Sequence, residues 1–235
     1  MQMGGSDQWG NITAGIELIR RMDAGTAHGL THPLVAKSDG TKFGKTEVCT
    51  VWLDADKTSP YEMYQFWLNT ADDDVVRFLR FYTLLPLAAI EELEVATREH
   101  PEKREAQRVL AQEVTKLVHG DAAVRDAETI TASLFSGEIG ALSADQLRQA
   151  FIGAPTTELS TADFGMPLVD VLVRAGLADS KRQSRELLSS GAVQVNGRRV
   201  SGVDAVLSPE AVLPGGFVVL RKGKKTFHIV KLKEK

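Results

Sequence analysis

The stretch from Ser59 to about Phe151 constrains the fold most, because its pattern is helical throughout. Ser59-Pro60-Tyr61-Glu62 combines a serine N-cap, a proline at the first helical position and a glutamate three residues after the serine, which together make a capping box. Ser143-Ala144-Asp145-Gln146 repeats the box, and Gly120 ends a long helix expected over 102–119. The sequence therefore predicts a compact α-helical domain over residues 58–152.

Residues 1–57 show a different pattern of strand, turn, helix, strand and mobile polar loop. Met1-Gln2-Met3 is expected to end a parallel strand, and glycines follow where the backbone turns. A helix is expected over 12–22, with isoleucines forming one apolar stripe. Leu34-Val35-Ala36 is the second expected strand. This order indicates an α/β part that precedes the helical domain.

The remainder of the chain predicts a linker and a second small domain. Residues 153–165 are poor in apolar side chains and rich in turn formers, so they are expected to be a flexible linker. Beyond 166, two helices precede Asn196-Gly197, a pair that favours a type I′ hairpin turn. Two strands are then expected over 217–221 and 226–232. Residues 166–235 thus form an α+β pattern.

Charge is unevenly distributed along the chain, whose net charge is −3. Residues 161–235 hold thirteen Lys and Arg against seven Asp and Glu, a net charge of +6, and the rest carries −9. An acidic body with a basic end is typical of proteins that bind a polyanion at that end. A solvated basic surface without a partner is the alternative.

Composition excludes several function classes. No apolar run reaches the length of a membrane span, and the N-terminus has no signal pattern. The single cysteine, Cys49, cannot form an internal disulfide, which fits a cytoplasmic protein. The five histidines lack metal-ligand spacing, so we propose no metal site.

The polar run from Lys37 to Glu47 is the most informative for function. Lys42 and Lys45 are three residues apart in a glycine-containing loop, so two ammonium groups can converge on one polyanion. A leaving pyrophosphate is such an anion, and a preorganised cation lowers the barrier to transfer at the α-phosphate. The alternative is a solvated surface hairpin whose lysines serve solubility.

Two segments resemble the catalytic domain of bacterial tyrosyl-tRNA synthetases. Lys42-Phe43-Gly44-Lys45-Thr46 is similar to that family's form of the lysine signature loop of class I synthetases. Gly4-Gly5-Ser6-Asp7-Gln8-Trp9-Gly10-Asn11 is similar to its nucleotide- and tyrosine-contacting turn. The resemblance continues in order to about Leu232, and residues 166–235 resemble an S4-type RNA-binding domain.

The resemblance implies residue roles. Lys42, Lys45 and Thr46 are expected to be catalytic, and ATP is expected to contact Gly5, Asp7, Lys42, Phe43, Gly44, Lys45 and Thr46. Gln8 would orient the tyrosine carboxylate or its adenylate. Asp7 would accept hydrogen bonds from ribose hydroxyls, or alternatively cap the helix that follows. Trp9 and Asn11 are interpreted as packing and turn-setting residues.

Basic residues of the S4-like domain are the expected RNA contacts. The set consists of Lys181, Arg182, Arg185, Arg198 and Arg199. Such a cluster would bind phosphates of a folded RNA rather than read bases. A plain surface role is the alternative. Lys116 and Arg125 in the helical domain are weaker candidates for phosphate contacts.

The expected fold is therefore multidomain. The tail of a doubly wound, Rossmann-like α/β catalytic domain (1–57) precedes an all-α anticodon-binding domain (58–152), a linker (153–165) and an S4-like domain (166–235). By resemblance the chain is the C-terminal half of a tyrosine–tRNA ligase, with ATP, Mg²⁺, tyrosine and tRNA(Tyr) as partners and a homodimeric, cytoplasmic, non-membrane parent. The parent would activate tyrosine to tyrosyl-adenylate and transfer it to the tRNA.

One motif of that family is missing. His28 and His32 do not form a His-x-Gly-His motif because their spacing is wrong, so the motif is expected upstream and the chain alone is expected to be inactive. Two alternatives are a non-catalytic S4-type RNA-binding protein and an S4-bearing RNA-modifying enzyme. An RNA-binding module alone has no reason to contain the lysine loop and the Gly-Gly-Ser-Asp-Gln turn. The modifying enzyme would need a catalytic Asp or Cys constellation that the helical middle lacks.

Overall fold

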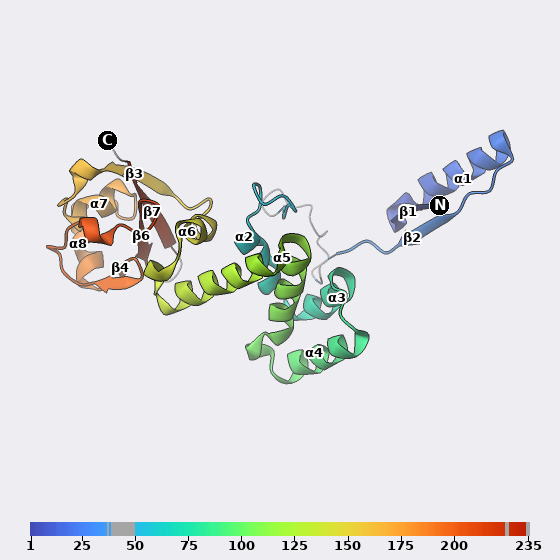
Figure 1. Ribbon diagram of the computed structural model, residues 1–235, viewed down its shortest axis with the longest axis horizontal. Helices are drawn as coiled ribbons and strands as arrows, with labels where there is room; N and C mark the ends of the chain where they lie inside the picture. The colour runs from blue at the N-terminus through green and yellow to red at the C-terminus, as the bar shows by residue number, and fades with distance from the viewer. Residues whose placement is uncertain (37, 39–49, 224–225, 234–235) are drawn as a thin grey trace.

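The computed structural model describes residues 1–36, 38, 50–223 and 226–233. The lysine-bearing segment 39–49 lies outside these ranges, so the expectations for Lys42, Phe43, Gly44, Lys45 and Thr46 are not tested by the structure. Figure 1 shows the described elements as an N-terminal strand–helix–strand unit, a helical part and a C-terminal sheet with its helices.

The N-terminal unit contains β1 (Gln2–Gly5), a 3₁₀ turn (Ser6–Gln8), α1 (Trp9–Asp23) and β2 (Gly29–His32). β1 and β2 are parallel, with Gln2 opposite Gly29, as expected for an α/β unit. Among the described hydrophobic side chains of this unit only Ile12 is buried. A Cβ on Gly29 would overlap the Cγ2 atom of Ile12. A glycine at position 29 therefore lets α1 approach β2.

The second strand is not where the sequence predicts it. Residues 34 and 35 lie outside any strand, and β2 ends at His32. Pro33 follows, and a proline has no N–H to continue a ladder of hydrogen bonds. His32 is therefore the last residue of β2.

The helical part consists of α2 (Pro60–Leu68), α3 (Asp72–Tyr82), α4 (Leu87–Glu99), α5 (Glu105–Ser136) and α6 (Ala144–Ala150). Both predicted capping boxes are present at the starts of α2 and α6. The predicted break at Gly120 is a kink inside α5, where the glycine has φ 84° and ψ 171°. That helix begins at Glu105 instead of near 102, because a 3₁₀ turn and the left-handed Arg104 precede it.

One apolar core joins α2, α3, α4 and α5. Its aromatic centre is Trp67, whose ring lies 4.9 Å from that of Tyr82 and 6.1 Å from that of Phe78, centroid to centroid. Leu79, Leu110 and Ala111 are fully buried beside them. Val35 and Val51, which flank segment 39–49, also pack against this core.

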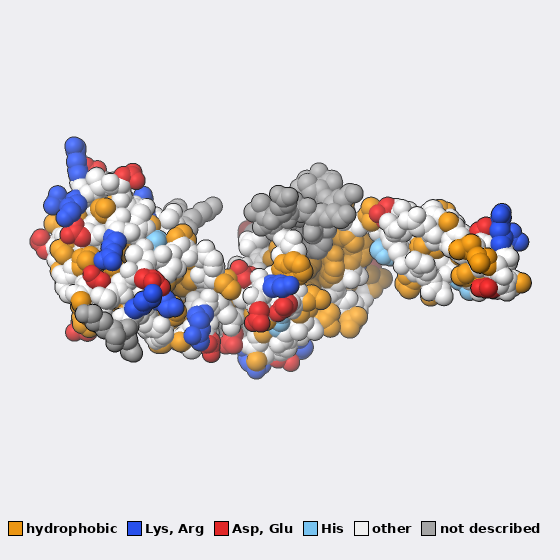
Figure 2. Space-filling view, turned by 90° about the horizontal axis from the view of Figure 1, so that it is seen from above, with side chains coloured by type: hydrophobic (Ala, Val, Ile, Leu, Met, Phe, Trp, Pro, Cys, Tyr) orange, Lys and Arg blue, Asp and Glu red, His pale blue; other side chains and the backbone are white. Residues whose placement is uncertain are grey.

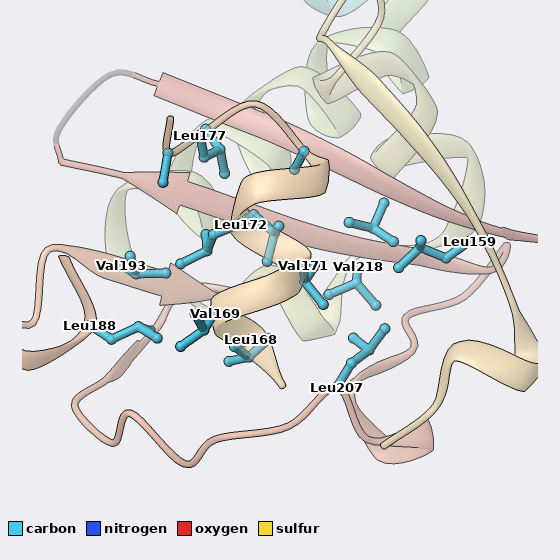
Figure 3. Packing of buried hydrophobic residues seen from close by; sticks show 14 residues of the cluster. Leu159, Leu168, Val169, Val171, Leu172, Leu177, Leu188, Val193, Leu207 and Val218 are labelled. Carbon is cyan, nitrogen blue, oxygen red and sulfur yellow. The ribbon is translucent and has the colours of Figure 1, made fainter. Parts of the chain in front are cut away.

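The C-terminal part is a five-stranded sheet in the order β3-β7-β6-β4-β5 with two helices. Its strands are β3 (Thr156–Ser160), β4 (Val193–Val195), β5 (Arg198–Val200), β6 (Phe217–Lys222) and β7 (Thr226–Lys233), and its helices are α7 (Leu168–Arg174) and α8 (Lys181–Ser189). Figure 3 shows Leu168, Val171 and Leu172 of α7 packed among Leu159, Val193 and Val218 of the sheet. Asn196 and Gly197 both have positive φ, 48° and 81°, as the predicted hairpin turn requires.

The expected flexible linker over 153–165 is wrong for most of its length. Thr156–Ser160 forms β3, which pairs in parallel with β7, and a 3₁₀ turn (Thr161–Asp163) follows. Leu159 of β3 is buried in the C-terminal core. Asp163 is fixed by hydrogen bonds from Ser160, chiefly the backbone N–H, which lower the pKa of its carboxyl.

A separate apolar cluster joins the helical part to the sheet. Ile130 of α5 and Leu147 of α6 are buried together with Val219 of β6 and Ile229 of β7. The end of α5 and all of α6 thus pack on the opposite face of the sheet from α7. Among the described helices, none is both long and apolar enough to cross a membrane.

Candidate functional site

The predicted nucleotide-contacting residues lie at the carboxyl end of β1. Gly5 is the last residue of β1, and Asp7 and Gln8 lie in the 3₁₀ turn that leads into α1. The side chains of Asp7 and Gln8 are exposed. In parallel α/β sheets, ligands bind outside the carboxyl ends of the strands. The structure therefore places all three residues at one edge, where a nucleotide can approach them.

Gly5 leaves this edge open. A Cβ at Gly5 would lie 2.7 Å from Oδ1 of Asp7 and 2.8 Å from Cδ2 of Leu34. Both distances are shorter than the normal contact between a Cβ and a non-bonded atom. Any side chain at position 5 would therefore displace the Asp7 carboxylate. The Asp7 carboxylate is exposed and can accept hydrogen bonds, for example from hydroxyl groups.

Asn11 contacts one of the candidate residues, a contact that the sequence analysis did not predict. Its side-chain amide donates a hydrogen bond to Oε1 of Gln8 at 2.9 Å. Nε2 of Gln8 in turn lies 3.5 Å from Oδ2 of Asp7. The chain of contacts orients the Gln8 amide, and the spacing of three residues between Gln8 and Asn11 at a helix start was the available signal. Trp9 does not pack as predicted, since it is 53% exposed.

The lysine run is represented in the structure by its flanking residues. Ala36 and Ser38 precede segment 39–49, and both hydrogen-bond to α3 through Arg77 and Asp74. After the run, the N–H of Trp52 donates to Oγ1 of Thr58 at 2.9 Å. The described residues on both sides of segment 39–49 therefore contact the helical part.

The five predicted RNA contacts are divided between α8 and β5. Lys181 and Arg185 are one turn apart on α8 and line a shallow pocket of about 330 Å³ together with Asp170 and Asp204. Nζ of Lys181 lies 2.8 Å from Oδ1 of Asp170. Arg182 lies on another side of α8, where its Nε is 3.2 Å from Oε1 of Glu186.

The other two arginines lie next to each other on one strand, β5. Arg198 and Arg199 are consecutive residues of β5 and are both exposed, so their side chains point to opposite faces of the sheet. Arg198 lines a pocket next to the end of α5. On the face shown in Figure 2, Lys and Arg side chains of the C-terminal part are spread out, with Asp and Glu between them.

The weaker candidates in the helical part are both on α5. Nζ of Lys116 lies 3.0 Å from Oδ1 of Asp121, across the kink at Gly120. That contact raises the pKa of the lysine. Arg125 is exposed one turn further on. Among the described residues, no group of three or more His, Cys, Asp or Glu side chains could hold a metal ion.

Comparison with known proteins identifies the family. Residues 1–136 match the family described as tRNA synthetases class I (W and Y). Residues 146–230 match the tyrosine–tRNA ligase SYY-like C-terminal domain. The chain therefore belongs to the class I tRNA synthetases of the tryptophan and tyrosine type.

Individual relatives carry a narrower name. The chain is 54% identical over 232 residues to a tyrosine–tRNA ligase of Geobacillus kaustophilus, and 50% identical over 234 residues to one of Staphylococcus carnosus. These alignments cover 98% and 99% of this chain and 55% of each relative, so the chain spans about half the length of the curated relatives it matches. The resemblance to bacterial tyrosyl-tRNA synthetases is confirmed.

A solved structure is also similar in sequence. A C-terminally truncated mitochondrial tyrosyl-tRNA synthetase of Aspergillus nidulans is 32% identical, with 57% of this chain and 39% of that chain covered and a TM-score of 0.48. The matches support a class I catalytic part followed by a tyrosyl-tRNA synthetase C-terminal domain. The boundaries predicted at 57, 152 and 165 stay predictions.

Proposed function

We propose that this chain provides the nucleotide-contacting turn, the lysine loop and the tRNA-binding part of a tyrosine–tRNA ligase. The observation that carries the proposal is the position of Gly5, Asp7 and Gln8 at the carboxyl end of β1, within a region that matches the class I synthetases. The non-catalytic RNA-binding alternative is not favoured, because the family match covers residues 1–136.

The proposed reaction has two steps. The tyrosine carboxylate attacks the α-phosphorus of ATP, the bond to the β-phosphate breaks and pyrophosphate leaves. A ribose hydroxyl at the 3′ end of tRNA(Tyr) then attacks the carbonyl carbon of the adenylate, and AMP leaves with the bonding electron pair. Mg²⁺ would arrive with the phosphates of ATP and neutralise part of their charge.

The candidate residues would have different roles in the first step. Asp7 would hold the ribose, Gly5 would let the sugar approach, and Gln8, oriented by Asn11, would bind the tyrosine carboxylate or the adenylate. Lys42, Lys45 and Thr46, with Phe43 and Gly44 between them, would act on the phosphates as pyrophosphate forms. A cation placed for the leaving group stabilises the transition state more than the ground state.

The remaining partners follow from the same family. The C-terminal part would bind phosphates of tRNA(Tyr) through Lys181 and Arg185 on one side of α8, with Arg182, Arg198 and Arg199 as separate contacts. We also propose that the full-length protein is a homodimer and acts in the cytoplasm.

The test uses a chimera, because the chain spans only 55% of its relatives. The part of the Geobacillus kaustophilus relative that this chain does not match is joined to the chain in the relative's own order. The chimera is expected to catalyse tyrosine-dependent ATP–pyrophosphate exchange. Lys42→Ala and Lys45→Ala are each expected to slow this exchange by removing about 2–4 kcal/mol of transition-state stabilisation. Lys103→Ala, an exposed lysine of the helical part, is the matched control. An inactive chimera, or a loss equal to the control, contradicts the proposal.

A further inference from the structure

Two side chains of α3 hold the residues that lead into the lysine run. Oδ1 of Asp74 accepts a hydrogen bond from the backbone N–H of Ser38 at 2.8 Å, and Oδ2 accepts one from Oγ of Ser38 at 3.2 Å. Nη2 of Arg77 donates to the carbonyl oxygen of Ala36 at 2.5 Å and to Oδ1 of Asp74 at 2.5 Å. Three of these hydrogen bonds link α3 to Ala36 and Ser38, and the fourth joins Asp74 to Arg77 within α3.

Asp74 is an unusual residue for this purpose because it is only 3% exposed. A buried carboxylate is costly unless its oxygens are hydrogen-bonded or paired with a cation. Asp74 sits in the first turn of α3, where the helix favours a negative charge. Its described partners are Arg77 and Ser38, and Ser38 lies 36 residues earlier in the chain. Ser38 therefore offsets part of the cost of burying Asp74, together with Arg77.

The other end of the segment is attached to the same helical part. The N–H of Trp52 donates to Oγ1 of Thr58, a residue that is 7% exposed. Nζ of Lys57 lies 4.4 Å from the centre of the Trp52 ring. Val35 and Val51 pack against the apolar core of α2 to α5. The described residues on both sides of segment 39–49 therefore contact the same helical part.

We infer that Asp74 and Arg77 are positioning residues for the adenylation reaction, which they affect by fixing where the chain carrying Lys42 and Lys45 departs from the helical part. This inference rests on the proposed function, because it assigns a catalytic consequence to that departure point. Neither Asp74 nor Arg77 is proposed to contact the substrate. The effect is sensitive because a displacement of about 1 Å at a distance from the chemistry can lower a rate about 100-fold.

The alternative is that the three hydrogen bonds from α3 to Ala36 and Ser38 only stabilise the fold. The two roles differ in what they change. A stabilising contact alters the unfolding temperature and leaves the rate of the folded protein unchanged. A positioning contact lowers the rate of adenylate formation in protein that is still fully folded, and leaves tyrosine binding unchanged.

The experiment compares variants within α3 of the chimera described above. Asp74→Asn keeps the shape of the side chain and removes its charge, and Arg77→Ala removes the donor to Ala36 from a side chain that is 40% exposed. Arg80→Ala is the matched control. Arg80 lies one turn after Arg77 on α3, and its side chain pairs with Glu94 of α4 at 3.0 Å. The readouts are the single-turnover rate of adenylate formation, the tyrosine Kd and the thermal unfolding midpoint.

The expected result is a fall of about 10- to 100-fold in the rate for Asp74→Asn and Arg77→Ala, with the tyrosine Kd unchanged and the assay kept below the unfolding transition. Arg77→Lys, which retains a donor, is expected to recover part of the rate. In a Lys45→Ala background, the further loss from Asp74→Asn is expected to be smaller than in the wild type, because one of the two lysines whose position it affects is absent. If Asp74→Asn fails to fold, Arg77→Ala carries the comparison.

The two proposals fail in different ways. A wild-type chimera without tyrosine-dependent exchange overturns the proposed function and this inference with it. An active chimera in which the α3 variants behave like Arg80→Ala, or add fully to Lys45→Ala, overturns only the inference. In the chain itself, hydrogen exchange at the Ser38 amide should speed up in Asp74→Ala and stay unchanged in Arg80→Ala. Equal exchange in both also contradicts the inference.

Discussion

Gly197 lies against Gly137 so closely that a Cβ on Gly197 would overlap the carbonyl oxygen of Gly137 and lie 2.7 Å from its carbonyl carbon. Gly137 ends α5 with φ 85°, and Gly197 is in the β4–β5 turn with φ 81°. The helical part and the C-terminal sheet therefore meet through two backbones without side chains. Such close approach requires glycine on both sides.

Gly197→Ala is expected to destabilise the protein by about 2 kcal/mol or more, because it adds a strained positive φ to a steric overlap with Gly137. Urea unfolding measures the change. Gly202→Ala is the matched control, since among the described residues nothing lies within 4 Å of a Cβ at that position. Equal effects from the two substitutions would show that the contact does not constrain the joint.

His228 makes stability depend on pH. The ring is 6% exposed in β7, and its Nε2 lies 2.8 Å from Oγ1 of Thr157 on β3. Burial lowers the pKa of His228 below its ordinary value of 6.5. The unfolded chain therefore binds a proton more readily than the folded one, so stability is complete above 6.5 and declines as the pH falls through that value toward the lower folded pKa.

The free energy of unfolding is expected to fall between about pH 7.5 and about pH 5.5, and His228→Gln should reduce that fall. Burial also lowers the pKa of His119 on α5, so part of the pH dependence should remain. His32→Gln, at an exposed histidine of β2, is the control. An identical pH dependence in wild type and His228→Gln would exclude His228 as a source.

Asn11→Ala is expected to weaken tyrosine or adenylate binding without lowering stability by more than about 0.5 kcal/mol. The residue is exposed, and its described side-chain contact is the hydrogen bond to Gln8. The measurement is the tyrosine Kd of the chimera, with Thr13→Ala as control, because Thr13 bonds only to backbone of the same helix among its described contacts. An unchanged Kd would mean that Gln8 needs no such support.

The division of basic residues on α8 predicts unequal effects on RNA binding. Lys181→Glu with Arg185→Glu should lower the affinity of the chain for tRNA(Tyr) and reduce the slope of log affinity against log salt by about 1 for each lost phosphate contact. Arg182→Glu, on another side of α8 beside Glu186, should have a smaller effect. Thermal stability should barely change, because exposed ion pairs contribute about 0–1 kcal/mol. Equal losses from the two sides of α8 would contradict this division.

Local sequence predicted much of the secondary structure. The capping boxes at Ser59 and Ser143, the kink at Gly120 and the Asn196-Gly197 turn are all present. Each depends on hydrogen bonds or backbone angles within a few residues, so a short window of sequence contains the cause. The strand expected over 34–36 was misplaced. A short apolar run does not by itself show which residues pair with a neighbouring strand.

The sequence by itself determined the local elements, the family and the candidate residues Gly5, Asp7 and Gln8. Only the tertiary structure decided that Thr156–Ser160 joins the sheet beside β7, that Lys181 and Arg182 lie on different sides of α8, and that Asp74 holds Ser38. These relationships join residues far apart in the chain or depend on which face of an element is covered. They result from packing of whole elements against one another, and no local preference of a residue for helix, strand or turn contains that information.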